Sequence, residues 1–141
     1  MKFNETTLPN GLKIITVPMT DNPAVTVLVM VSTGSKYEKK ETNGLSHFLE
    51  HMVFKGTPKR PKSIDISREL ESLGAQYNAF TAQEYTGYYA KVNPEHIDID
   101  STIQEPDIKY PSISNMMVKM AEIANRVDDL LIENGLRQSA N

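Results

Sequence analysis

The sequence predicts an α+β fold: helices pack on one face of a mostly antiparallel sheet, and a long helix lies near the C-terminus. Segments rich in β-branched and aromatic residues come before and after two helical patterns, instead of alternating with them. The chain has 141 residues, the usual size of one domain. Strands that are grouped in this way pair mostly with hairpin neighbours, which are antiparallel.

The first third of the chain is predicted to consist of strands. The pair Asn10-Gly11 separates a short Thr-rich run from residues 12–17, and such a pair is typical of a tight hairpin turn. A loop bounded by prolines follows over residues 18–23. Residues 24–32 are apolar and β-branched, which predicts a central strand.

A first helix is predicted over residues 44–55, with Thr42 or Asn43 as its N-cap. Gly56 and Pro58 end the helical pattern in the expected order. The apolar residues of this helix recur at the positions of one stripe: Leu45, Phe48, Leu49, Met52 and Val53. This pattern is typical of an amphipathic helix.

A second, shorter helix is predicted to follow Ser63 and to end at Gly74. Two strands rich in Tyr, Thr and Phe come next, over Ala75–Thr81 and Tyr85–Val92. The short connection between them predicts an antiparallel hairpin.

The pattern changes after Asn93-Pro94, so we divide the chain into residues 1–98 and an atypical segment, residues 99–141. Apolar residues at 3–4 spacing over residues 113–131 predict one long amphipathic helix. Two interpretations are open. The apolar stripe packs on the domain's own sheet, or its methionines pair with another chain.

Composition and charge exclude several classes of function. The chain has 15 Lys and Arg against 18 Asp and Glu, so it lacks the positive excess that nucleic-acid binding needs. Its longest apolar run, residues 24–31, is far shorter than the ~20 residues of a membrane-spanning helix. The first residues show no signal or transit peptide, and we therefore expect a cytoplasmic protein without a membrane partner.

The absence of cysteine restricts any metal site to His and carboxylate ligands, and the chain has three His. His47 and His51 stand four residues apart on the first predicted helix, so they lie one above the other at about 6 Å and can reach one ion. Glu50 is at the edge of the same face, where it can take a proton from a water without binding the metal. This is the H-x-x-E-H spacing of inverted zinc peptidases. The alternative is a pair of surface histidines on the polar side of the helix.

Several further segments point to the same class of protein. The longest is GLSHFLEHMVFKGT at residues 44–57, and shorter ones are LPNGL at 8–12, GS at 34–35, LESLGA at 70–75, NAFT at 78–81 and YTGYY at 85–89. With these segments, residues 1–98 resemble the pitrilysin/insulysin-type zinc metallopeptidases, or inverzincins, a group that includes the processing peptidases.

This resemblance implies that His47 and His51 bind Zn²⁺ and that Glu50 is the general base. It also implies that one segment lies on an edge strand and pairs with the backbone of a peptide or unfolded polypeptide substrate: Asn78, Ala79, Phe80 and Thr81. Without the resemblance, that segment is typical of a strand whose aromatic side chain packs inward.

The resemblance places a third zinc ligand on a later helix, where Glu122 has the matching local context, VKMAEI. The spacing along the chain favours Asp128 instead, or its neighbour Asp129. A further alternative is that no side chain completes the site, in which case Glu122 forms an exposed i, i+4 ion pair with Arg126.

We therefore predict a zinc-dependent endopeptidase, as a catalytic domain or part of one. The alternative is a non-catalytic or truncated metallopeptidase-like module that binds peptide or a partner subunit. The resemblance implies a partner in either case, because the family builds a closed chamber from several related domains. A third hypothesis is that the motif is a relic and that residues 113–135 form a dimerisation helix.

Overall fold

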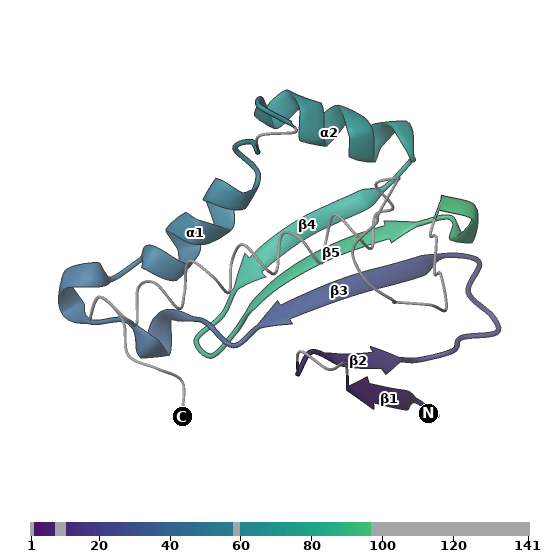
Figure 1. The fold of residues 1–141 in the computed structure, drawn as a ribbon, viewed down its shortest axis with the longest axis horizontal. Coiled ribbons are helices and arrows are strands. Elements are labelled where there is room, and N and C mark those ends of the chain that lie inside the picture. The colour runs from purple at the N-terminus through teal and green to yellow at the C-terminus, as the bar shows by residue number, and fades with distance from the viewer. Residues whose placement is uncertain (1, 8–10, 58–59, 97–141) are drawn as a thin grey trace.

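The computed structural model describes residues 2–7, 11–57 and 60–96 of the chain. Within these ranges it has two antiparallel sheets and two α-helices, which confirms the α+β class (Figure 1). The predicted C-terminal helix lies outside the described residues, as do Glu122, Asp128 and Asp129. No helix in the described part is long and apolar enough to cross a membrane.

The first sheet is the predicted hairpin. β1 (Asn4–Thr7) pairs antiparallel with β2 (Lys13–Thr16), so that Thr7 lies opposite Lys13. Gly11, in the connection between the strands, has a φ of 85°, a left-handed conformation that favours glycine.

The second sheet has three antiparallel strands in the order β3-β5-β4. These are β3 (Val25–Val31), β4 (Gln76–Thr81) and β5 (Thr86–Val92). The strand predicted over residues 24–32 is confirmed as β3, but the central strand of the described sheet is β5. The burial patterns explain this: β3 alternates between more and less exposed residues, whereas five of the seven residues of β5 are buried.

The core lies between this sheet and the helices α1 (Leu45–Val53) and α2 (Ser63–Ser72). Its buried apolar residues come from α2, β3 and β5: Val31, Ile66, Leu70, Tyr88, Ala90 and Val92. Val53 and Phe54, at the end of α1, pack against the same cluster. Both helices therefore cover one face of the sheet, as predicted (Figure 1).

The apolar stripe of α1 is only partly covered. Two of its residues, Phe48 and Met52, are 58% and 45% exposed. The helix contacts the sheet at its lateral strand β4, and only the C-terminal end of α1 reaches the apolar cluster.

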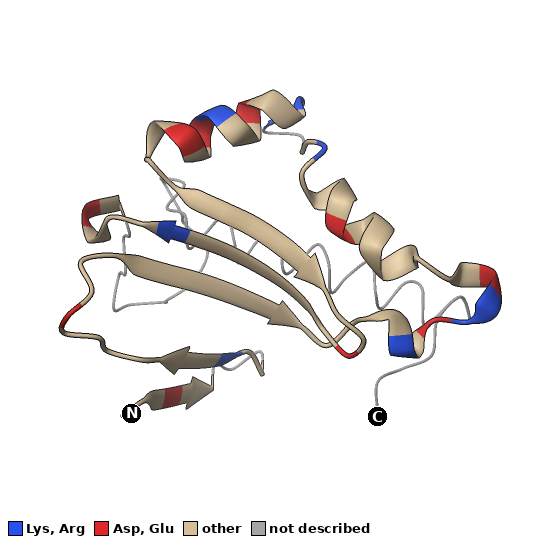
Figure 2. Ribbon diagram, turned by 180° about the vertical axis from the view of Figure 1, so that it is seen from behind, with Lys and Arg blue, Asp and Glu red and all other residues tan. Residues whose placement is uncertain are grey.

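Charged side chains are concentrated outside the three-stranded sheet (Figure 2). β3 and β4 carry none and β5 carries one, Lys91. On the face turned away from the helices, Leu28 and Met30 are 49% and 55% exposed. The sheet therefore has apolar residues on both faces, and among the described residues the helices α1 and α2 cover one of them.

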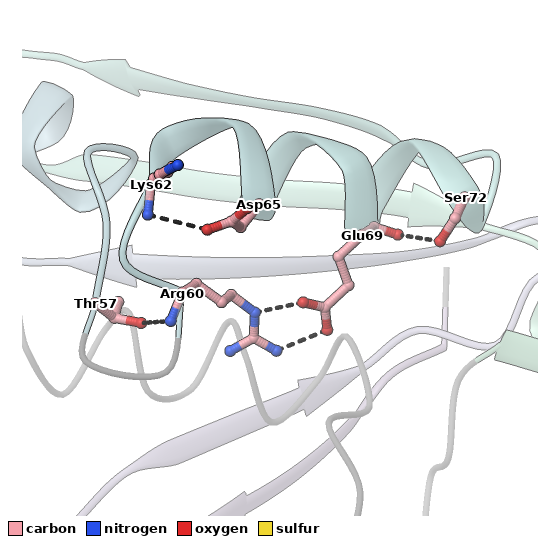
Figure 3. A network of polar contacts seen from close by, with 6 residues as sticks. All are labelled: Thr57, Arg60, Lys62, Asp65, Glu69 and Ser72. Carbon is pink, nitrogen blue, oxygen red and sulfur yellow. Dashed lines mark hydrogen bonds and ion pairs between the residues drawn. The ribbon is translucent and has the colours of Figure 1, made fainter.

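Polar contacts tie the α1–α2 connection to α2 (Figure 3). The guanidinium of Arg60 donates two hydrogen bonds to the Glu69 carboxylate, through Nε to Oε2 and through Nη2 to Oε1, the latter at 2.6 Å. The backbone N–H of Arg60 also bonds to the Thr57 hydroxyl at 3.1 Å. At the start of α2, the Lys62 N–H donates to Asp65 Oδ2 at 3.1 Å, which satisfies one N–H at the helix N-terminus.

Candidate metal centre

A side chain from the preceding loop holds the N-terminus of α1. The N-cap residue is Gly44, with a φ of 92°, and its position offers no side-chain cap. Instead, the Glu38 carboxylate accepts the N–H of Gly44 on Oε2 and the N–H of Ser46 on Oε1, each at 2.7 Å. The prediction of Thr42 or Asn43 as the N-cap is therefore wrong, because a carboxylate six to eight residues earlier already satisfies the first N–H groups of the helix.

His47 and His51 project from successive turns of α1 toward the same point. Their Nε2 atoms are 3.1 Å apart and their ring centroids 4.6 Å apart. Two nitrogen ligands at ~2.0–2.1 Å from one tetrahedral zinc ion lie about 3.3 Å from each other. The observed separation therefore fits two ligands of a single metal ion. Both side chains are exposed to solvent.

Glu50 lies on the side of α1 that faces the end of β4. It is half-buried, and its Oε2 accepts a hydrogen bond from the Thr81 hydroxyl at 2.5 Å. Burial raises the pKa of Tyr88 on β5 to about 12, and the nearby charge of Glu50 adds to that effect. These contacts place the Glu50 carboxylate over the inner face of the β4–β5 hairpin.

An open cleft of about 420 Å³ joins α1 to the end of β4. Its lining residues come from three places in the sequence: Ser35, His47, Glu50, Phe80, Thr81 and Ala82. The structure therefore brings two residues of the predicted metal motif together with two of the predicted substrate strand. Asn78 and Ala79 lie farther along β4, where Ala79 packs against the core and its N–H bonds to Asn78 Oδ1 at 2.9 Å.

Ser35 and Ala82 are cleft residues to which no role had been assigned from the sequence. The loop after β3 reaches the β4–β5 turn because the Ser35 N–H bonds to the Ala82 carbonyl at 3.2 Å. Gly34 permits this approach, since a Cβ at that position would lie 2.5 Å from the carbonyl oxygens of Ala82 and Gln83. The Gly34-Ser35 match was the signal in the sequence that marked this loop.

Phe80 does not pack inward. Its ring covers Gly87 on β5, where an added Cβ would lie 2.3 Å from Phe80 Cζ. The rings of Phe80 and Tyr85 meet edge to face, with their centroids 6.1 Å apart. Phe80 remains 39% exposed, so the interpretation of an inward aromatic at this position is wrong. Strict alternation along β4 directs Tyr77 to the core and Phe80 to the opposite face.

The described part of the chain brings together two candidate metal ligands and not three. No group of three or more His, Cys, Asp or Glu in it could hold a metal ion. The candidates for a third ligand lie beyond residue 96, outside the described residues.

Comparison with known families gives a match over most of the chain. Residues 13–128 match the family described as insulinase, peptidase family M16. The chain belongs to the insulinase family. This confirms the resemblance to pitrilysin-type processing peptidases that the motifs indicated. The matched segment also extends past residue 98, where the resemblance by motifs ends, and it includes Glu122 and Asp128.

Relatives of this chain in the insulinase family carry names of processing and zinc-dependent proteases. The chain is 39% identical over 134 residues to the mitochondrial-processing peptidase subunit beta of Dictyostelium discoideum, covering 95% of this chain and 27% of that protein. It is 46% identical over 93 residues to an uncharacterized zinc protease of Bacillus subtilis, covering 64% and 22% respectively. The crystal structure of a protease from Helicobacter pylori matches with a TM-score of 0.64 and 30% identity, over 67% of this chain and 23% of that one. The chain thus spans about a quarter of the length of these relatives.

Proposed function

We propose that this chain carries the metal helix and the general base of a zinc-dependent endopeptidase. The observation that carries the proposal is the 3.1 Å separation of the His47 and His51 Nε2 atoms, with Glu50 beside them in the same cleft. Membership of a peptidase family and relatives named as zinc proteases support the same assignment.

Each residue has a defined part in this proposal. His47 and His51 would hold the ion, and the zinc ion, when bound, supplies a Lewis acid for the scissile carbonyl and for a water molecule. Glu50 acts as general base and then as general acid: it accepts the proton of the attacking water and delivers it to the leaving amine. The half-buried carboxylate faces the cleft, where a peptide can reach it.

The substrate is proposed to be a peptide or unfolded polypeptide that pairs with β4. This strand is lateral in the described sheet, so a peptide can add to its free edge through main-chain hydrogen bonds. Such pairing would compete with the bond from the Ala79 N–H to Asn78 Oδ1, so Asn78 has to turn away when the peptide binds.

The third ligand is proposed to be Glu122, which lies within the segment matched by the family. Zinc per chain in protein purified without added metal tests this assignment. We expect a ratio near one for the wild-type chain and near zero for Glu122→Gln, with Asp128→Asn as the matched control. Loss of zinc in the control alone would move the assignment to Asp128.

The test of the catalytic proposal is Glu50→Gln. We expect this substitution to abolish cleavage of a fluorogenic peptide library and to leave zinc content unchanged, because Glu50 is not a ligand. Glu41→Gln, which removes the same charge from the exposed loop before α1, is the control. Cleavage that persists in Glu50→Gln would contradict the proposal.

A second candidate function is a non-catalytic module that binds a peptide or a partner subunit. Two observations favour it: the described residues bring only two ligands together, and apolar side chains such as Leu28, Met30 and Phe48 stay about half exposed. The Dictyostelium relative is named as a subunit, which also supports a partner. A monomer, by sedimentation, that cleaves peptides unaided would exclude this alternative.

A further inference from the structure

We propose that Thr81 is a positioning residue, whose hydroxyl holds the Glu50 carboxylate in register with strand β4. The inference rests on the proposed function and deepens it, because it explains how the base is aimed at a peptide bound along that strand. It is carried by the contact between the two side chains and by the way the ends of β4 and β5 are fixed.

The hydroxyl of Thr81 donates to Glu50 Oε2 at 2.5 Å. Within the described part of the chain, Oε1 of Glu50 accepts no hydrogen bond, so it stays available for the proton that a base must take up. A carboxylate that is held on one oxygen keeps its second oxygen at a fixed place in the cleft. Both side chains are half-buried, which limits competition from solvent for this bond.

The position of Thr81 is well fixed because hydrogen bonds hold the end of the β4–β5 hairpin. It is the last residue of β4 and lies opposite Thr86 on β5. The next residue, Ala82, donates its N–H to the Tyr85 carbonyl at 2.8 Å, and the buried Thr86 hydroxyl donates to the Thr33 carbonyl at 2.9 Å. The oxygen that holds Glu50 therefore moves with the strand rather than with a loose loop.

The bond between Thr81 and Glu50 sets where the carboxylate lies relative to β4. β4 is the strand proposed to receive the peptide backbone, and α1 carries the proposed base. The Thr81–Glu50 bond joins these elements at the cleft, so it sets the position of the carboxylate relative to a bound peptide bond. Small misplacements of a catalytic group reduce turnover more than they reduce substrate binding.

The first test needs neither metal nor activity. In the metal-free, isotope-labelled full chain, three-bond couplings from the backbone nitrogen and carbonyl carbon of Thr81 to its methyl carbon report its χ1 rotamer. We expect one rotamer in the wild type and rotamer averaging in Glu50→Ala. The couplings of Thr26, exposed on β3, are the internal control and should stay unchanged. Couplings of Thr81 that do not respond to Glu50→Ala would overturn the inference.

The second test uses cleavage of the peptide library. Thr81→Val keeps the shape and removes the hydroxyl, so we expect kcat to fall by about 10- to 100-fold with little change in KM, the usual effect of losing an outer partner in a metal site. Thr81→Ser should restore most of the rate, and Thr26→Val should match the wild type. Equal rates in Thr81→Val and the wild type, or failure of Thr81→Ser to rescue, would overturn the inference. A wild-type chain without zinc or cleavage would instead overturn the proposed function, while the couplings still decide whether Thr81 holds Glu50.

Discussion

The carboxylate of Glu38 accepts the backbone N–H of Ser46 at 2.7 Å, one residue before the first proposed zinc ligand. The segment that carries Glu38 is itself fastened to the β4–β5 turn. The Lys36 N–H bonds to the Gln83 carbonyl at 2.8 Å, and the Lys36 ammonium pairs with Glu84 at 2.6 Å. The N-terminus of α1 is therefore held in place relative to the end of the sheet that forms the cleft.

Substitution of Glu38 by Gln should destabilise the start of α1. The charge and one good acceptor at the helix N-terminus are lost, which we expect to cost about 1 kcal/mol in the free energy of unfolding. Urea unfolding measures this cost, and faster hydrogen exchange of the Ser46 amide locates it. Glu41→Gln changes the net charge equally on the same loop and should leave both unchanged; equal effects of the two substitutions would mean that net charge alone matters.

The Arg60–Glu69 pair predicts a loss of stability in acid. The hydrogen bond from Arg60, together with its charge, lowers the pKa of Glu69 below its ordinary value of 4.5. A lowered pKa means that the contribution is complete above pH 4.5 and is lost as the pH falls through the lower, folded-state pKa. The pair is partly open to solvent, so we expect Glu69→Gln to cost only about 1 kcal/mol at pH 7.

Urea midpoints between pH 7 and pH 2 test this linkage. The difference between the wild type and Glu69→Gln should shrink in acid. Glu71→Gln, on the exposed side of the same helix, should show no such convergence. A difference that stays constant across the range would refute the assignment of the acid sensitivity to Glu69.

Two glycines should differ in their tolerance of alanine. In Gly34→Ala the new Cβ meets backbone carbonyl oxygens that are held in the β4–β5 turn, so we expect a loss of about 2–3 kcal/mol. In Gly87→Ala the obstacle is the exposed Phe80 ring, which can move aside at a cost of about 1 kcal/mol. Thermal or urea unfolding compares the two, with Ser32→Ala as a neutral control; equal losses at both glycines would contradict the close approach at Gly34.

Tyr88 should ionise well above the ordinary pKa of a tyrosine, 10. The chain has six tyrosines, and burial followed by the charge of Glu50 raises the pKa of Tyr88 to about 12. The neutral form is favoured in the folded state, so its contribution to stability is complete below pH 10 and is lost as the pH rises toward 12.

Absorbance at the phenolate band measures this titration. Tyr88→Phe should remove the step near pH 12, and Glu50→Gln should move that step to lower pH because the neighbouring charge is gone. Glu41→Gln should leave it in place. If no ionisation step is seen near pH 12 while the circular dichroism stays native, Tyr88 is not buried near Glu50.

The local elements and the metal motif were determined by the sequence alone. The β1–β2 hairpin, the helices α1 and α2 and the β4–β5 hairpin each depend on residues close together in the chain, where turn chemistry and side-chain period act directly. The same holds for His47 and His51, since a four-residue spacing on a helix already puts both rings on one face.

Relationships between distant residues were decided only by the tertiary structure. Periodicity identifies an apolar face without saying what covers it, so it could not show that Phe48 and Met52 stay exposed. Strand order depends on which edges meet, and that made β5 the central strand of the described sheet. A polar group pairs with any suitable partner within reach. The bond of Glu38 to the Ser46 N–H and the bond of Thr81 to Glu50 therefore follow from folding, which brings together residues 8 and 31 positions apart.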